Sequence, residues 1–261
     1  MTPILGITAS QISGHLFVNT PPITSGLTHW YDGSDDTTMT KSSNQISQWN
    51  SKSPATSGVN VSNATGAQQP EYTANYQNGL SVVNFVDANS DHLGVGTQPT
   101  TGSTAFTVFM VLKPTTTAGK LVATSWGSEQ AAGAGFDLSM GILLAANDGK
   151  YYSTFAGWRA VASSSTYSSA WSIVQAKYAG GAGSLNQKIN NADSVSSTSD
   201  GPISITNAPG GAKFNLGWMD YWEAQAGYDG YMGDVLIYAG TLLSDADCTS
   251  TYDWLKAKWG L

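Results

Sequence analysis

The residues best suited to acid–base chemistry are the three glutamates of the chain, Glu71, Glu129 and Glu223. A retaining glycosidase needs two carboxyl groups about 5 Å apart, one as the nucleophile and one as the acid and base. The three glutamates lie far apart in the sequence, and no Asp-x-Asp or Asp-x-Glu pair falls on an expected central strand. The sequence therefore predicts that the protein is not an enzyme, with glycoside hydrolysis as the least favoured alternative.

The histidines and the cysteine do not form a catalytic or metal-binding motif. His15, His29 and His92 are isolated in the sequence, with no serine or cysteine elbow beside them. The lone Cys248 excludes an internal disulfide and a zinc site with several thiolates. The glycine-rich run at 180–183 has no following lysine, so it does not indicate a phosphate-binding loop. These residues predict no cofactor.

An acidic turn supplies the best candidate metal ligands. Asp32, Asp35 and Asp36 are close together and offer the oxygen ligands that calcium prefers. The same Asp-x-x-Asp-Asp pattern is typical of a turn held by bonds between side chains and backbone. Both interpretations stay open, with calcium as a structural ion wherever it is bound.

A dense group of aromatic residues near the end of the chain predicts a glycan-binding surface. Pyranose rings stack on exposed aromatic faces, while flanking polar groups bind the hydroxyls. The stretch 218–231 combines five aromatic residues with Asp220, Glu223 and Gln225. The glycan-binding candidates are Trp218, Tyr221, Trp222, Tyr228 and Tyr231, followed by Trp126, Trp158 and Arg159. About half of these side chains are equally expected to pack in the core or within a loop.

Composition limits the class of protein and its partners. The chain has 261 residues, 11% of them charged and 41% hydrophobic, and its nine tryptophans are enough for a sizeable core. Serine, threonine, asparagine and glycine are typical of strands and turns rather than helix surfaces. A net charge of −7, without a basic cluster, argues against a nucleic-acid partner. No stretch approaches the roughly 20 apolar residues of a spanning helix, and no secretory signal is recognised at the start.

The elements that must position these residues are short strands. Runs of alternating or aromatic-rich character recur about every ten residues, which is typical of an all-β antiparallel sandwich. The expected strands cover 27–31, 46–49, 80–86, 105–113, 120–126, 135–142, 150–156, 171–178, 203–206, 213–218 and 228–238. The run 105–113 is continuously apolar and predicts a central strand covered on both faces. Asn147-Asp148-Gly149 predicts a tight hairpin, whereas 179–201 is expected to be loop with one short strand.

One helix is predicted near 245–257. Ser244 is a suitable N-cap, and acidic residues in the first turn and lysines in the last turn complement the helix dipole. An apolar stripe at helical spacing is formed by Cys248, Tyr252, Leu255 and Trp259. We expect this helix to pack on the edge of the sandwich.

Three segments carry a family resemblance: GLTHWYDGSDDTTMTKSSNQISQWNSKS at 26–53, QQPEYTANYQNGLSVVNFVDANSDHLGVG at 68–96 and GYMGDVLIYAGTLLSDADCTSTYDWLKAKWGL at 230–261. In this order they resemble laminin-G-like, concanavalin-A-type jelly-roll domains. The resemblance implies a two-sheet antiparallel jelly-roll sandwich over residues 26–261, a fold that also hosts glycoside hydrolases and calcium sites. The side chains expected to fill the space between the sheets are Trp30, Trp49, Phe85 and Leu93, with Asn78-Gly79 in a turn.

Residues 1–25 are expected to form an N-terminal extended arm that ends at the stiff spacer Pro21-Pro22. The segment TPILGITASQISG at 2–14 resembles the N-termini of structural proteins of tailed bacteriophages. This resemblance implies that residues 1–24 bind a neighbouring virion protein. The arm residues expected at that contact are Ile4, Leu5, Ile7, Ile12 and Leu16. The alternative is an N-terminal strand folded onto the chain's own domain.

Together these features favour a non-enzymatic virion structural protein: a capsid decoration, head-fibre or tail-appendage subunit. It is expected at the virion surface after assembly in the host cytoplasm, as a homo-oligomer that contacts host glycans but neither nucleic acid nor membrane. The alternative is a lectin-like adhesin module that binds carbohydrate. No cofactor is expected, apart from calcium if the acidic turn binds it.

Overall fold

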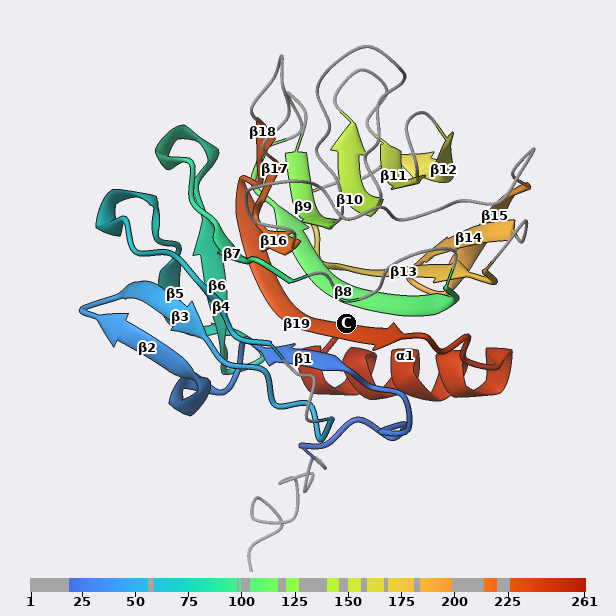
Figure 1. The fold of residues 1–261 in the computed structure, drawn as a ribbon, viewed down its shortest axis with the longest axis horizontal. Coiled ribbons are helices and arrows are strands. Elements are labelled where there is room, and N and C mark those ends of the chain that lie inside the picture. Colours follow the sequence, from blue (N-terminus) through green and yellow to red (C-terminus); the bar gives the residue numbers. More distant parts are fainter. Residues whose placement is uncertain are drawn as a thin grey trace, which may run out of the picture.

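The computed structural model describes residues 19–55, 59–97, 99, 104–116, 121–126, 140–145, 150–155, 159–166, 169–180, 184–198, 214–219 and 226–261. Over these residues the chain is antiparallel β structure with an α-helix near the C-terminus (Figure 1). No helix in this part of the chain has the length and apolar character needed to cross a membrane.

One run of paired strands curves around the core on the side of the helix (Figure 1). Its order is β1 (His29–Asp32), β19 (Gly230–Ala239), β8 (Phe106–Pro114), β13 (Ser172–Tyr178), β14 (Ser184–Ile189) and β15 (Ala192–Thr198). The first part of β19 also pairs with β6 (Leu80–Phe85), and β6 pairs with β5 (Glu71–Gln77). All these pairings are antiparallel.

A second run of strands lies across the core from the first. Its order is β4 (Val61–Ser62), β7 (Leu93–Val95), β16 (Phe214–Leu216), β9 (Leu121–Trp126), β10 (Met140–Ala145), β11 (Lys150–Phe155) and β12 (Arg159–Thr166). β3 (Gln45–Trp49) pairs with β2 (Met39–Ser42), β4 and β5, so it joins the two runs. A short separate pair is formed by β17 (Trp218–Met219) and β18 (Ala226–Gly227).

The pairing through β3 makes one continuous curled sheet of 17 strands among the described residues. The predicted all-β antiparallel class with a C-terminal helix is therefore confirmed. The two-sheet jelly-roll sandwich is not confirmed, because hydrogen bonding passes from one run of strands to the other instead of stopping at two separate sheet edges.

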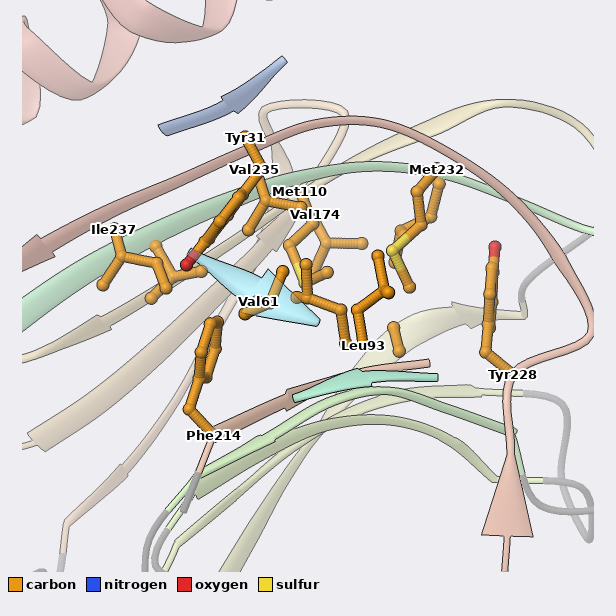
Figure 2. Packing of buried hydrophobic residues seen from close by; sticks show 14 of the residues in the cluster. Tyr31, Val61, Leu93, Met110, Val174, Phe214, Tyr228, Met232, Val235 and Ile237 are labelled. Carbon is orange, nitrogen blue, oxygen red and sulfur yellow. The ribbon is translucent and has the colours of Figure 1, made fainter. Parts of the chain in front are cut away.

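The two faces of the sheet bury two apolar clusters. The inner cluster includes Tyr31, Val61, Leu93, Met110, Val174, Phe214, Tyr228, Met232, Val235 and Ile237, and Figure 2 shows them pointing toward one another from facing strands. The outer cluster is formed by Leu27, Trp30, Val82, Phe109, Val111, Ile173, Leu236, Tyr238, Leu243, Cys248, Leu255 and Trp259. In β8, Val108, Met110 and Leu112 face the inner cluster while Phe109 and Val111 face the outer one. The predicted central strand covered on both faces is confirmed.

The helix α1 (Asp245–Trp259) covers part of the outer face (Figure 1). The Ser244 hydroxyl accepts a hydrogen bond from the Asp247 backbone N–H, and the helix ends at Gly260 with φ of 65°. Cys248, Leu255 and Trp259 are buried. The predicted cap and apolar stripe are confirmed, and the helix ends two residues later than the expected boundary at 257.

Two local expectations are corrected. The segment 179–201 was expected to be mostly loop, but it contains the hairpin of β14 and β15. Asn190 and Asn191 make its turn with φ of 50° and 58°, and Asn tolerates this left-handed conformation. Trp49, Phe85 and Leu93 fill the inner cluster as expected, whereas Trp30 lies in the outer cluster under α1. Residues 147–149 lie outside the described residues, but the strands on either side pair as Ala145 with Lys150.

The described chain begins at the end of the N-terminal arm. Pro21 is buried, Ile23 packs against the outer cluster, and the Ile23 carbonyl accepts a hydrogen bond of 2.9 Å from the Tyr238 hydroxyl. Pro21 and Ile23 therefore anchor this segment on the domain. The arm residues expected to bind a partner, Ile4, Leu5, Ile7, Ile12 and Leu16, lie outside the described residues.

Candidate functional site

A row of side chains crosses four strands on the outer face. Tyr231 of β19 pairs in register with Asn84 of β6 on one side and Lys113 of β8 on the other. Asn84 in turn pairs with Glu71 of β5. Residues directly opposite each other on neighbouring strands point to the same face of a sheet. We call Glu71, Asn84, Tyr231 and Lys113 the outer row; Glu71 is exposed and the other three are half-buried.

Aromatic rings stand over the middle of this row. Tyr76 stacks on Tyr231 with ring centroids 4.1 Å apart and an interplanar angle of 27°. Trp171 meets the Tyr76 ring edge-on at 6.4 Å and 70°. We call Tyr76, Trp171 and Tyr231 the aromatic cluster; all three are only partly buried. Offset stacking and edge-to-face contacts of this kind hold rings in fixed orientations.

Lys113 joins the outer row to the aromatic cluster. Its Nζ donates a hydrogen bond of 3.1 Å to the Tyr76 hydroxyl and lies 4.9 Å from the Tyr76 ring centroid and 5.8 Å from that of Tyr231. Among the described residues, no carboxylate lies within ion-pair distance of this ammonium. A cation held over ring faces without a carboxylate partner retains donor capacity for a ligand.

A bulge in the β5–β6 hairpin directs Tyr76 toward the outer face of the sheet. The register of the β5–β6 hairpin shifts between Thr73 and Gln77, and the turn at Asn78-Gly79 has φ of 52° and 73°. The predicted Asn78-Gly79 turn is thus confirmed. Asn75 is also left-handed, with φ of 51°. This bulge places Tyr76 beside Tyr231 rather than beside the inner cluster.

The C-terminal end of α1 fixes the aromatic cluster through hydrogen bonds and ring stacking. The Gln77 side chain donates to the Trp259 carbonyl at 2.8 Å, and the Asn78 side chain donates to the Lys258 carbonyl at 2.9 Å. The Trp259 ring stacks on Trp171 at 5.8 Å with an interplanar angle of 23°. The helix end therefore fixes both the hairpin that carries Tyr76 and the indole next to it.

The polar groups of the site suit hydroxyl recognition. The hydrogen bond with Tyr76, burial and the negative charges of Asp229 and Glu71 raise the pKa of Tyr231 to about 12. Its phenol therefore stays neutral at physiological pH and keeps a donor proton. Within the described part of the chain, neither the Glu71 carboxylate nor the Asn84 amide has a hydrogen-bond partner. The site offers ring faces together with an ammonium, an amide and a carboxylate.

Among the predicted glycan-binding residues, the three whose side chains the structure describes do not gather at one place. Tyr231 belongs to the aromatic cluster, but Trp218 is 8% exposed and Tyr228 is fully buried. Tyr228 packs against Phe85 of the inner cluster at 6.2 Å, and Trp218 packs near His92 at 6.0 Å. These two rings are therefore not exposed stacking platforms. Tyr221, Trp222 and Trp158 lie outside the described residues, and Trp126 and Arg159 are described only as the end of β9 and the start of β12.

Sequence reasoning missed four residues of the site, Tyr76, Asn84, Lys113 and Trp171. Tyr76, Lys113 and Trp171 are distant from one another and from 218–231 in the sequence. The only local signal was the Asn-Gly turn two residues after Tyr76, which predicts a hairpin but not the face on which the tyrosine lies.

The acidic turn does not fit a calcium site. Asp32 accepts from Lys258 at 2.6 Å and from Lys52 at 2.9 Å, and Asp35 accepts from Lys52 at 2.7 Å. Ammonium groups thus hold the oxygens that calcium would require. Asp36 pairs with Lys41 at 3.0 Å. The described residues contain no group of three His, Cys, Asp or Glu side chains that could hold a metal.

The turn interpretation of the same residues fits the structure. An Asp32 carboxylate oxygen accepts from the Ser34 backbone N–H at 3.0 Å, and an Asp35 oxygen accepts from the Thr37 backbone N–H at 3.2 Å. These are the bonds between side chain and backbone that such turns use. The acidic cluster is therefore structural.

Asp32 also belongs to a buried ion network with Asp234 and Lys258. Lys258 lies 2.6 Å from Asp32 and 2.8 Å from Asp234, and the Trp30 and Trp259 indoles donate to Asp234 at 2.9 and 2.7 Å. Burial alone would raise the pKa of Asp32, but the Lys258 charge and its hydrogen bond hold it below the usual value. Burial raises the pKa of Asp234 despite Lys258. Among the described residues, Asp32 is held ionised by both Lys258 and Lys52, whereas Asp234 pairs with Lys258 alone.

The two described histidines, His29 and His92, are packed into the structure rather than grouped into a site. Burial lowers the pKa of His29 to about 4, and its ring bonds the Thr28 hydroxyl at 3.0 Å. His92 Nδ1 bonds the Ser90 carbonyl at 2.9 Å. His15, Glu129 and Glu223 lie outside the described residues.

Comparisons with known proteins give similarity in structure only. No protein-family model matches the chain, and no curated protein matches its sequence. The Trypanosoma rangeli sialidase in complex with the inhibitor DANA is 12% identical, with a TM-score of 0.55 over 91% of this chain and 36% of the sialidase. The CBM40 of Ruminococcus gnavus IT-sialidase, bound to alpha2,3 sialyllactose, is 11% identical, with a TM-score of 0.52 over 69% of this chain and 98% of the module.

A third match is too distant to carry an argument. Domain 4 of AbnA, a GH43 extracellular arabinanase from Geobacillus stearothermophilus, is 17% identical, with a TM-score of 0.45 over 87% of this chain and 97% of that domain. None of these three matches is a phage protein. The laminin-G-like resemblance has no matching family model behind it.

These matches establish the fold and correct one prediction. The chain spans about a third of the length of the sialidase that it matches, and the matched structures are glycan-binding or glycoside hydrolase domains. The prediction that the chain is not an enzyme is contradicted, because glycoside hydrolases are among its structural neighbours. Scattered glutamates in the sequence do not exclude catalysis in this fold.

Proposed function

We propose that the chain is a carbohydrate-binding domain with a concanavalin-A-like jelly-roll arrangement, and that the aromatic cluster with the outer row binds the glycan. The observation that carries the proposal is the half-buried Tyr76–Tyr231 stack beside Lys113, an ammonium with no carboxylate partner among the described residues. The structural likeness to a carbohydrate-binding module supports this reading.

The chemistry of the site matches the two sides of a sugar ring. The apolar C–H face of a pyranose packs on an aromatic ring, while its equatorial hydroxyls need donors and acceptors at the rim. Here the rings of Tyr76, Tyr231 and Trp171 provide the apolar surface. Lys113 and Asn84 provide donors, and Glu71 provides a strong acceptor beside them.

A glycan array followed by calorimetry tests the proposal. The full chain should bind a limited set of glycans, and Tyr231→Ala should weaken the best of them at least tenfold, which is about 1.4 kcal/mol. Tyr252→Ala is the matched control, because Tyr252 is a half-buried tyrosine on α1 away from the row. If the array shows no binding, or if both variants lose affinity equally, the aromatic cluster is not a glycan site.

A separate proposal concerns location, and it rests on the resemblance of residues 2–14 to phage structural proteins. In this proposal residues 1–24 attach the chain to a virion, where it forms a homo-oligomer and presents the glycan site to the host. A variant lacking residues 1–18 keeps Pro21 and Ile23 on the domain. It should stay folded but no longer label phage particles in electron micrographs. Full labelling by this variant would overturn the attachment role.

A further inference from the structure

The outer row is longer than one sugar. Adjacent strands lie about 4.8 Å apart, so the three steps from Glu71 through Asn84 and Tyr231 to Lys113 span about 14 Å. The next strand beyond Lys113 is β13, where Ser172 pairs with Leu112 and Trp171 precedes Ser172. Trp171 therefore continues the row, which then spans about 19 Å.

The chemistry of the row changes along its length. Its middle is apolar, with the Tyr231 ring covered on one face by Tyr76. One end carries the exposed Glu71 carboxylate and the half-buried Asn84 amide, and the other end carries Lys113 beside the Trp171 indole. A single sugar packed on Tyr76 and Tyr231 would not reach Glu71, which lies two strands away from Tyr231.

The row also lacks the shape expected of a site for a single terminal sugar. Its four members come from one register position on each of four neighbouring antiparallel strands, so they are arranged along a line rather than around a pocket. One unit of a linear glycan extends about as far as one spacing between strands. A line of polar and aromatic groups at that spacing fits consecutive units of one chain.

We infer that the outer row and aromatic cluster bind an extended oligosaccharide of at least three sugar units, laid across the strands from Glu71 toward Trp171. This inference rests on the proposed function and adds the class of ligand: a linear chain recognised along its length rather than a terminal monosaccharide. The central unit packs on the tyrosine pair, and the flanking units bind Asn84 with Glu71 on one side and Lys113 with Trp171 on the other.

The test is a ladder of chain lengths. Linear oligosaccharides of one to six units of β-1,4-linked glucose, β-1,4-linked N-acetylglucosamine and β-1,3-linked glucose are titrated into the full chain by calorimetry, together with homologous series of any glycan found on the array. The affinity should rise at least tenfold between one and four units and then level off. A monosaccharide bound as tightly as the tetramer overturns the inference and leaves the proposed function standing. Failure of every sugar to bind, at every length, overturns both.

Variants at the end and the centre of the row sharpen the test. Glu71→Ala should weaken the tetramer several-fold but leave the disaccharide unchanged, whereas Tyr231→Ala should weaken both. Asp253→Ala removes an exposed carboxylate on α1, outside the row, and serves as the control that changes neither affinity. If Glu71→Ala binds the tetramer as tightly as the wild type, the ligand does not reach the Glu71 end and the inference is wrong.

Discussion

Lys258 and Lys113 occupy the same face of the sheet and are both surrounded by aromatic rings, yet they are used in different ways. Lys258 is 2% exposed, lies 5.2 and 5.5 Å from the Trp254 and Trp259 ring centroids, and is neutralised by Asp32 and Asp234. Two carboxylates of the protein itself therefore bind this buried ammonium. The result is a buried ion network that ties α1 to β1 and β19.

Lys113 also lies beside aromatic rings, but it has no carboxylate neighbour among the described residues. It lies over Tyr76 and Tyr231 and donates to one phenol, and no described carboxylate neutralises it. Rings and a lysine are thus not enough to identify a binding site in this chain. The difference between the two lysines is the presence of carboxylate partners. Lys258 is paired with carboxylates of the protein, whereas Lys113 has none among the described residues and can still bind a ligand.

Replacing each lysine with methionine should separate the two regions most clearly. Lys258→Met leaves the buried Asp234 carboxylate without its cation and leaves Asp32 with Lys52 alone among the described cations, and breaking a buried pair in this way costs about 3–5 kcal/mol. Lys113→Met removes a half-buried cation with no carboxylate partner, so the free energy of unfolding should change by less than about 0.5 kcal/mol. Urea unfolding of both variants, with the slope m checked for constancy, measures the difference. Equal destabilisation by the two substitutions would break the comparison.

The features that could be predicted from the sequence are those set by neighbours along the chain. The cap at Ser244, the apolar stripe of α1 and the Asn78-Gly79 turn each depend on a few consecutive residues, and each was found in place. The central strand at 105–113 was also predictable. An uninterrupted run of apolar residues in a strand places apolar side chains on both faces of the sheet, so both faces must be buried.

The site could not be predicted in the same way, because strand register decides it. Tyr76, Lys113 and Tyr231 meet only through the pairing of β5, β6, β19 and β8, which no local pattern specifies. The dense aromatic stretch 218–231 was a misleading guide for Trp218 and Tyr228. A high density of aromatic residues in the sequence does not show which of the rings are buried by neighbouring strands. The Trp218 and Tyr228 side chains are both buried.

The steric link between the two regions gives the next prediction. A Cβ on Gly233 would lie 2.7 and 2.8 Å from atoms of the Trp259 indole, which donates to Asp234 and stacks on Trp171. Gly233→Ala therefore forces Trp259 to move, at a cost of about 1–3 kcal/mol for overpacking. Displacing Trp259 should also disturb Trp171, so glycan affinity should fall together with thermal stability.

Gly66→Ala is the control for this substitution. A Cβ at Gly66 meets no atom within 4 Å, so the variant should be unchanged or more stable by up to about 1 kcal/mol. Thermal unfolding and calorimetric titration of both variants give the two readouts. A Gly233→Ala protein with lower stability but unaltered glycan affinity would show that the ion network and the aromatic cluster are independent.

The smallest expected effect is a shift in the ionisation of one phenol. An ordinary tyrosine titrates near pH 10, whereas the hydrogen bond with Tyr76, burial and the nearby negative charges raise the pKa of Tyr231 to about 12. Because the folded state holds this proton more tightly than the unfolded chain, the associated stability is present below pH 10 and is lost as the pH rises through 12. The phenolate absorbance of the wild type minus that of Tyr231→Phe should therefore appear near pH 12.

Glu71→Gln removes one of the negative charges, so it should lower the pKa of Tyr231 by a few tenths, which corresponds to less than about 1 kcal/mol. Asp253→Asn is the control, because burial and then the Asp253 charge raise the pKa of Tyr252 on α1, whereas Asp253 does not act on Tyr231. A midpoint near 10 in the wild type would mean that Tyr231 is solvated like a free tyrosine. The stacked pair would then not be in place to receive a sugar, and Lys113 would differ from Lys258 only in being more exposed.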